Sequence, residues 1–294
     1  MTDPQHTDHH PAPADAGHGF GARLLAAMQE HGPLCVGVDP HPQLLAQWGL
    51  PDSPDGLARF CAVVMEAMGG RVAAVKPQSA FFERHGSAGI AVLERLLADL
   101  RSVGTLSVLD VKRGDIGSTM GAYAQAYLAD GAPLAADAIT LTPYLGTGAL
   151  EPAVALAAAT GRGLFVLVLT SNPEAAAVQH TGNPSVAGSV TSEIARLNAG
   201  RTPVGDVGMV VGATVADAPH DLGIDLVAAN GVVLAPGVGA QGATPEDLAR
   251  TFAGLERRVL VPVSRGILSA GPALERLRGA GETLSAELVS RLWS

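Results

Sequence analysis

The stretch AITLTPYLGTGALEPAVALAAATGRGLFVLVLTS, residues 138–171, decides the fold class. It joins an apolar run, AITLTP (138–143), to a second apolar run, GLFVLVLTS (163–171), through the Ala- and Leu-rich segment LEPAVALAAATGRG (150–163). Continuous apolar runs separated by a helical segment are typical of parallel strands that are buried on both faces. The stretch therefore predicts a strand–helix–strand unit.

The same pattern repeats along the chain of 294 residues, which contains eight apolar, strand-like runs. They are LCVGVD (34–39), VAAVKP (72–77), LSVLDVK (106–112), AITLTP (138–143), GLFVLVLTS (163–171), VGMVVGAT (207–214), GVVLAPGVG (231–239) and VLVPVSRGI (259–267). Eight such units match a (β/α)8 TIM barrel, which reaches this length as a single domain. A doubly wound open sheet is the alternative, but such sheets usually have fewer strands, and no G-x-G-x-x-G follows the first run. We therefore expect a barrel domain over residues 20–294.

The first 19 residues differ from the rest. The segment MTDPQHTDHHPAPADAGHG (1–19) is polar and Pro-rich, and its few apolar residues follow no period. Such a composition cannot bury enough apolar surface to fold, so it predicts a disordered tail. A helix-like segment follows from about Gly21 to Glu30.

Composition excludes several classes of function. The net charge of -9 and the lack of a Lys/Arg-rich run argue against a nucleic-acid partner. No run of 18 apolar residues predicts a membrane span, and no secretory signal pattern stands at the N-terminus. The two cysteines, Cys35 and Cys61, lie in apolar runs without zinc-ligand spacing, so we expect buried thiols, no metal and a cytoplasmic protein.

Lysine is scarce in this chain, since only Lys76 and Lys112 occur among 19 basic residues and the others are arginines. A lysine can shift its pKa and donate a proton, whereas an arginine effectively cannot. Both lysines stand at the ends of strand-like runs, which favours a chemical role over a compositional accident.

Polar residues gather at the carboxyl ends of the predicted strands, where TIM barrels build their active sites. They are Asp39, Lys76, Asp110, Lys112, Thr142, Thr170, Ser171, Thr214, Gln241 and Arg265. One or two polar strand ends would be ordinary caps, but polar residues at nearly all eight ends indicate a ligand site.

The motif Asp110-Val111-Lys112-Arg113-Gly114-Asp115-Ile116 carries the strongest chemical signal. Residues two apart on a strand face the same side, so Asp110 and Lys112 should both point into the barrel, where Lys76 can join them. Charges in a barrel mouth are costly unless they are paired. An alternating Lys/Asp array meets that need and presents an ammonium beside a carboxylate; a purely structural ion-pair network is the alternative.

A phosphate site is predicted at the last two strands. APGVGAQG (235–242) offers backbone N–H groups and the Gln241 amide, and VPVSRG (261–266) offers the Arg265 guanidinium. TIM barrels often bind phosphate after strands seven and eight. A simple tight turn would also explain the glycines, but not Arg265 beside them.

Taken together, D-x-K-x-x-D-I (110–116) followed by Thr119 resembles the signature of the orotidine 5′-phosphate decarboxylase family. The resemblance extends through GVDP (37–40), VKPQSAFFE (75–83), SNPEAAAVQ (171–179), PGVGAQG (236–242) and Arg265. It is greatest to the bacterial branch with longer inserts. It implies a homodimeric (β/α)8 enzyme that converts orotidine 5′-monophosphate to UMP and CO2, the last step of UMP synthesis.

The resemblance also implies roles for the polar residues. Lys112 would stabilise and protonate the C6 carbanion, and Asp110 would lie against the substrate carboxylate. The remaining implied roles are ribose binding by Asp39 and Lys76, entry into the partner's site by Asp115 and Thr119, a CO2 pocket lined by Ile116, and phosphate binding by Gln241 and Arg265. Residues after Pro236 would form part of a closing lid.

No cofactor signature is present, so the protein itself must stabilise the carbanion by preorganised electrostatics. One residue departs from the family pattern: Ala149 stands where a serine that bonds the pyrimidine is expected. Its backbone N–H or nearby Thr147 could compensate, and we expect weaker pyrimidine recognition.

Two other functions remain open at this point. A related sugar-phosphate barrel enzyme, such as an aldolase or a Mg2+-dependent decarboxylase, shares D-x-K-x-x-D. A Schiff-base lysine would lack flanking carboxylates, however, and Lys112 has Asp110 beside it. A non-catalytic barrel that binds phosphorylated ligands is the second alternative, and only Ala149 favours it.

Overall fold

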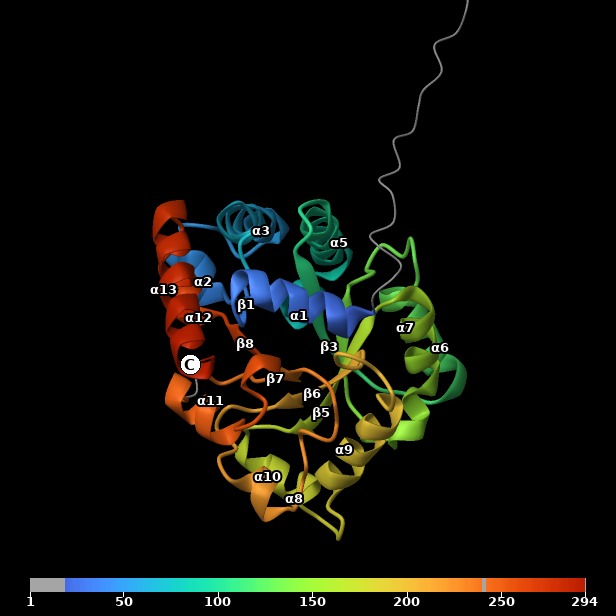
Figure 1. The fold of residues 1–294 in the computed structure, drawn as a ribbon. Coiled ribbons are helices and arrows are strands. Elements are labelled where there is room, and N and C mark those ends of the chain that lie inside the picture. Colours follow the sequence, from blue (N-terminus) through green and yellow to red (C-terminus); the bar gives the residue numbers. More distant parts are fainter. Residues whose placement is uncertain (1–18, 240–241, 294) are drawn as a thin grey trace, which may run out of the picture.

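The computed structural model describes residues 19–239 and 242–293. Its eight strands form a closed parallel barrel in sequence order, which confirms the predicted (β/α)8 class (Figure 1). The strands are β1 Leu34–Val38, β2 Ala74–Pro77, β3 Leu106–Arg113, β4 Ala138–Leu141, β5 Gly163–Leu169, β6 Val207–Val211, β7 Val233–Leu234 and β8 Val259–Val263. The predicted tail, apart from Gly19, lies outside the described residues.

Helices lie outside the barrel and connect its strands (Figure 1). The longer ones are α1 Phe20–His31, α3 Pro54–Met68, α5 Gly86–Ser102, α6 Gly117–Leu128, α7 Glu151–Thr160, α9 Val186–Leu197, α11 Pro245–Thr251 and α13 Leu274–Leu292. The shorter ones are α2 Pro42–Gln47, α4 Ala80–Glu83, α8 Ala176–Gln179, α10 Ala218–Asp221 and α12 Arg265–Leu268, with 3-10 turns η1 Thr147–Leu150, η2 Pro173–Ala175 and η3 Glu256–Arg258.

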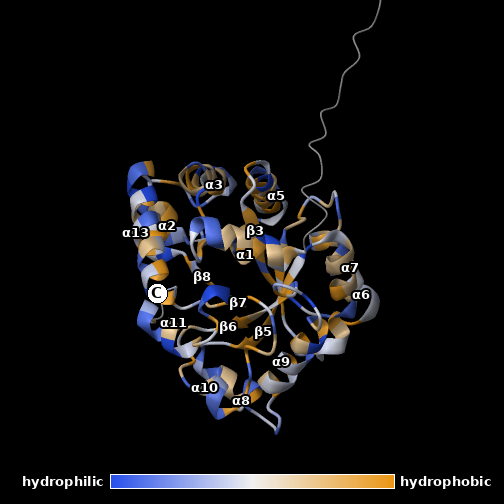
Figure 2. Ribbon diagram, viewed as in Figure 1, coloured by the Kyte–Doolittle hydropathy of each residue, from blue (hydrophilic) through white to orange (hydrophobic). Residues whose placement is uncertain are grey.

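The core has two layers, because each buried strand turns alternate residues inward and outward. The outer layer packs strand residues such as Val75, Leu109 and Ile139 against the helices. The inner layer fills the barrel with residues that include Ala74 and Val108. In Figure 2 the strands are mostly hydrophobic, and helices carry hydrophilic residues on their outer sides.

Helix α1 closes the amino-terminal end of the barrel. It lies across that end in Figure 1, and its buried residues Phe20, Leu24 and Met28 belong to the inner core. Phe20 packs edge-on against Phe165 of β5, with ring centroids 6.0 Å apart. Because the amino-terminal end is filled, a ligand can reach the charged strand ends only from the opposite, carboxyl-terminal end.

The seventh strand is shorter than the run GVVLAPGVG suggested, since β7 contains only two residues. Pro236 cannot donate a ladder hydrogen bond, and Gly237 has φ 126°, a conformation that favours glycine. The segment after β7 therefore leaves the sheet early and becomes part of the wall of the barrel mouth.

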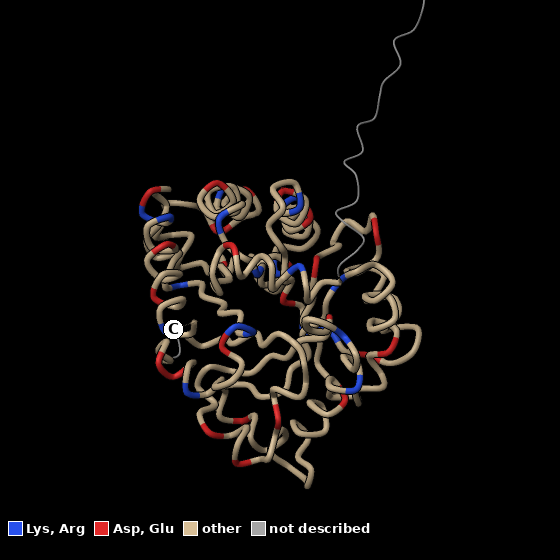
Figure 3. Tube along the Cα trace, viewed as in Figure 1, with Lys and Arg blue, Asp and Glu red and all other residues tan. Residues whose placement is uncertain are grey.

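Acidic and basic residues are interspersed over the outer helices (Figure 3). This distribution fits the expectation that an anionic ligand is held by a few placed cations, not by a broad positive surface. Within the part of the chain that the structure describes, no helix is both long and apolar enough to span a membrane.

Candidate active site

The carboxylate of Asp110 is the centre of a charged cluster at the carboxyl-terminal end of the barrel. Its Oδ1 accepts hydrogen bonds from Lys112 Nζ at 2.6 Å and Thr140 Oγ1 at 2.9 Å. Its Oδ2 accepts from Lys76 Nζ at 2.9 Å and Gln78 Nε2 at 3.0 Å. The predicted meeting of Asp110, Lys112 and Lys76 is confirmed. Four donors satisfy a carboxylate that is only 7% exposed.

The alternation of the strands explains why these side chains meet. Ala74, Val108 and Ala138 fill the inner core on three neighbouring strands. The residues two positions further along are Lys76, Asp110 and Thr140, and they therefore also face inward. All three are buried.

The cluster stabilises its own charges. Burial alone would raise the pKa of Asp110, but the ammonium groups of Lys76 and Lys112 outweigh it and hold the pKa well below its usual range. Burial alone would lower the pKa of Lys76, but the carboxylates of Asp110 and Asp39 outweigh it and raise the pKa. Asp110 is therefore an anion and Lys76 a cation at neutral pH.

Lys112 has an unusual backbone conformation. Its φ is 44°, in the left-handed region that non-glycine residues rarely adopt. The pairing of β3 with β4 shifts here, because Leu109 lies opposite Ile139 whereas Arg113 lies opposite Leu141. Lys112 thus lies in a bulge, and its side chain is 48% exposed at the barrel mouth while its Nζ still reaches Asp110.

The other side of the mouth forms a cavity next to this cluster. Its lining includes Asp39, His41 and Lys76 from the first two strand ends, and Gly37, Pro236–Val238 and Pro262–Arg265. The Oδ1 atom of Asp39 is buried and has no hydrogen-bond partner among the described residues. An unsatisfied carboxylate oxygen in a cavity wall is suited to accept hydrogen bonds from ligand hydroxyls. Arg265 brings a guanidinium to the same cavity, and Gln241 lies outside the described residues.

The residues after β3 lie at the rim of the site. Asp115 Oδ1 accepts a hydrogen bond from Ile116 N at 2.8 Å, and Thr119 is exposed on α6. Ile116 is 62% exposed, and Tyr144 and Leu145 after the neighbouring strand are 79% and 54% exposed. Large apolar side chains are therefore exposed in the loops that follow β3 and β4.

Ala149 lies in η1, the 3-10 turn that follows β4. Its backbone N–H donates to the carbonyl of Gly146 at 3.1 Å. The N–H that could have compensated for the missing serine is thus engaged within the turn in this conformation. Thr147 lies half-buried in the same turn.

Two members of the cluster, Gln78 and Thr140, were missing from the sequence prediction. Gln78 follows β2 and forms an isolated bridge with Asp110. Thr140 is the one polar residue in the run AITL, and its inward position could have been deduced from the alternation with Ala138.

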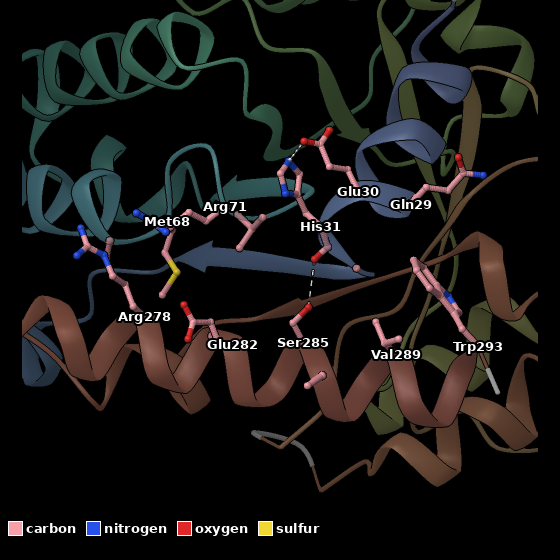
Figure 4. Close-up of a pocket in the computed structure, with 15 residues that line it drawn as sticks. Gln29, Glu30, His31, Met68, Arg71, Arg278, Glu282, Ser285, Val289 and Trp293 are labelled. Atoms are coloured by element: carbon pink, nitrogen blue, oxygen red, sulfur yellow. Dashed lines mark hydrogen bonds and ion pairs between the residues drawn. The ribbon is translucent and has the colours of Figure 1, made fainter.

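A larger cavity lies at the amino-terminal end, between α1, α3 and α13 (Figure 4). It is lined by residues that include His31, Met68, Arg278, Ser285 and Trp293. Ser285 Oγ donates to the carbonyl of His31 at 3.1 Å. In a TIM barrel this end contributes stability and the opposite end contributes chemistry. The size of this cavity therefore does not make it the active site.

The Lys76–Asp110–Lys112 cluster lies at the carboxyl-terminal mouth of a (β/α)8 barrel, the end at which enzymes of this fold class carry their active sites. The model of the "Orotidine 5'-phosphate decarboxylase / HUMPS family" matches residues 32–280. The chain belongs to this family.

Relatives of high identity carry the same family name. An orotidine 5′-phosphate decarboxylase of Salinispora arenicola is 56% identical over 276 residues, which cover 93% of this chain and 98% of the relative. One from Streptomyces coelicolor is 55% identical over 273 residues, covering 92% and 96%. A crystal structure assigned as orotidine 5′-phosphate decarboxylase from Streptomyces avermitilis has a TM-score of 0.90 and 52% identity, and covers 94% of this chain and 97% of its own.

Proposed function

We propose that this chain decarboxylates orotidine 5′-monophosphate to UMP and CO2, and that Lys112 and Asp110 perform the chemical step. The observation that carries the proposal is the Lys76–Asp110–Lys112 cluster, in which Lys76 and Asp110 are buried, beside a cavity with an unsatisfied Asp39 oxygen. The names of relatives at 55–56% identity over more than nine-tenths of the chain support the substrate. They favour this reading over a sugar-phosphate enzyme or a binding protein.

In the chemical step, the bond between C6 and the carboxyl carbon breaks and its electron pair stays on C6. The Lys112 ammonium stabilises this developing negative charge, since a preorganised cation is worth most where charge appears in the transition state. A proton then moves from Lys112 Nζ to C6, which gives UMP. Solvent can reprotonate the amine because the Lys112 side chain is half-exposed before substrate binds.

Asp110 has two functions in this scheme. Its low pKa keeps it ionised, so its negative charge raises the pKa of Lys76 and its Oδ1 holds Lys112 Nζ at 2.6 Å. It also lies against the substrate carboxylate, whose departure as neutral CO2 relieves the repulsion between two anions.

Substrate binding uses the rest of the mouth. Asp39 and Lys76 bind the ribose hydroxyls, and Gln241 with Arg265 binds the 5′-phosphate. The phosphate lies far from C6, so its binding energy can contribute to closure of the site by the residues after Pro236. No cofactor or metal has a role in the scheme. Among the described residues, no group of three or more His, Cys, Asp or Glu is placed to hold a metal ion.

The proposal includes a homodimer with shared sites. Asp115 and Thr119 extend into the partner's site, and Ile116 lines the pocket that receives CO2. The exposed apolar residues Ile116, Tyr144 and Leu145 beside the cluster support a partner at this position. A cytoplasmic location is also proposed, because Cys35 and Cys61 are both free thiols and the cytosol keeps thiols reduced.

The direct test is the change in ultraviolet absorbance of orotidine 5′-monophosphate with purified protein and EDTA, with UMP identified as product. Turnover that EDTA does not affect is the expected result. Loss of turnover in EDTA that returns with Mg2+ would instead support a metal-dependent sugar-phosphate type of site. Binding of UMP without turnover would support the binding protein.

A further inference from the structure

The bulge in β3 leaves a gap in the pairing with β4 at the point where the proposed catalytic residues stand. Three residues lie between Leu109 and Arg113, but only one lies between their partners Ile139 and Leu141. The partner residue in between is Thr140. A regular ladder cannot satisfy the backbone groups across such a gap.

The Thr140 hydroxyl occupies this gap. It accepts a hydrogen bond from the backbone N–H of Lys112 at 2.9 Å and donates one to Asp110 Oδ1 at 2.9 Å. Thr140 is 1% exposed. One buried hydroxyl therefore contacts the backbone of the proposed proton donor and the carboxylate that fixes its ammonium.

The backbone of Lys112 requires such support. A φ of 44° is unfavourable for a residue with a Cβ, and it persists only when surrounding contacts hold it. The side chain of Lys112 is half-exposed, so packing around the side chain contributes little. The hydrogen bond from Lys112 N to Thr140 Oγ1 fixes the backbone directly.

We infer that Thr140 is a positioning residue of the decarboxylation. It holds the backbone of Lys112 in its left-handed conformation, and it holds Asp110 Oδ1 within hydrogen-bond distance of Lys112 Nζ. The inference rests on the proposed role of Lys112. Thr140 acts through its neighbours and has no direct part in proton transfer.

Thr140→Val tests the inference, since valine keeps the branched shape and removes the hydroxyl. A misplacement of about 1 Å at a reacting group can lower a rate by about 100-fold, so we expect kcat to fall by about that factor. The KM for orotidine 5′-monophosphate should change far less, because the ribose and phosphate contacts remain. Thr140→Ser, which restores the hydroxyl, should recover most of the lost kcat.

Ser107→Ala is the matched control. Ser107 is also buried on the β3–β4 contact, and its hydroxyl also accepts from a backbone N–H and donates to an aspartate, here Asp137. It lies at the amino-terminal end, away from the proposed chemistry. We expect Ser107→Ala to lower the midpoint of thermal unfolding and to leave kcat unchanged.

A wild-type kcat in Thr140→Val would overturn the inference, and so would an equal loss of kcat in Ser107→Ala. If the valine variant does not fold, Thr140→Ala and Thr140→Ser decide the same question, since they differ by the hydroxyl. Lys112→Ala is measured in parallel. Turnover that survives in Lys112→Ala contradicts the role of Lys112 in the proposed function, whereas an inactive Lys112→Ala beside a fully active Thr140→Val contradicts the role of Thr140 alone.

Discussion

The contact between β3 and β4 carries the same chemical arrangement twice, once at each end of the barrel. At the carboxyl-terminal end, Asp110 accepts from the Thr140 hydroxyl and from the two lysines. At the amino-terminal end, Asp137 Oδ2 accepts from the Ser107 hydroxyl at 2.9 Å, and its Oδ1 pairs with Arg23 at 3.1 Å.

The two arrangements differ in their cations and in their backbone. Arg23 also donates to the carbonyl of Gly161 at 3.0 Å, so it joins α1 to the rest of the barrel. Its guanidinium does not donate a proton at neutral pH, unlike a lysine ammonium. Lys112 stands in a strained bulge with its side chain half-exposed. From this difference we infer that an aspartate–hydroxyl pair serves stability where it holds an arginine between elements, and that the similar pair at the open mouth, which holds a lysine, serves the proposed chemistry.

The largest difference in kcat is expected between variants of the two aspartates, Asp110 and Asp137. Asp110→Asn removes the anion that fixes Lys112, and we expect kcat to fall by at least about 100-fold. Asp137→Asn should leave kcat unchanged. Steady-state kinetics of both variants checks this, and similar losses in the two would contradict the comparison.

Mixing two inactive variants should restore activity if each active site at the carboxyl-terminal end contains Lys112 from one subunit and Asp115 from the other. Lys112→Ala and Asp115→Ala subunits mixed equally give half heterodimers, each with one intact site, so about a quarter of wild-type activity is expected. The control is each variant incubated alone. Absence of recovery despite proven subunit exchange would remove Asp115 from the partner's site.

Removing the cation at the amino-terminal end should affect stability only. Arg23→Ala breaks the pair with Asp137 and the bond to Gly161, and we expect the free energy of unfolding to fall by about 1–3 kcal/mol. Urea unfolding measures this change. Arg59→Ala is a suitable control, since the pair of Arg59 with Asp55 is exposed and should contribute at most about 1 kcal/mol. Equal losses of unfolding free energy in the two variants would show that the Arg23 pair stabilises the protein no more than an exposed pair does.

The smallest expected effect concerns Ala149. Ala149→Ser supplies a hydroxyl where the family resemblance predicts one, and one hydrogen bond of about 1 kcal/mol should raise kcat/KM roughly fivefold. Thr147→Ser is the control in the same turn. An unchanged kcat/KM in Ala149→Ser would show that this turn does not recognise the pyrimidine.

Much of this comparison could be predicted from the sequence. The eight apolar runs determined the barrel, because buried parallel strands are apolar on both faces. The inward alternation of Lys76 and Asp110 followed from the period of two. The short β7 was predicted less well, since Pro236 and Gly237 end a run that is otherwise apolar.

The bulge could not be predicted. A regular strand would have placed Lys112 inward by alternation alone, whereas its position depends on the register shift against β4 and on the Thr140 hydroxyl. Both are long-range properties of the folded barrel. The engagement of the Ala149 N–H by Gly146 likewise depends on the conformation of the turn, which local sequence did not determine.

The most direct test of the central claim is a single measurement series on Lys112→Ala: turnover of orotidine 5′-monophosphate beside the dissociation constant for UMP. The account predicts that turnover falls by more than about 1,000-fold while UMP still binds, because the proposed ribose and phosphate contacts do not involve Lys112. Substantial remaining turnover would contradict the role of Lys112 as the stabilising cation and proton donor.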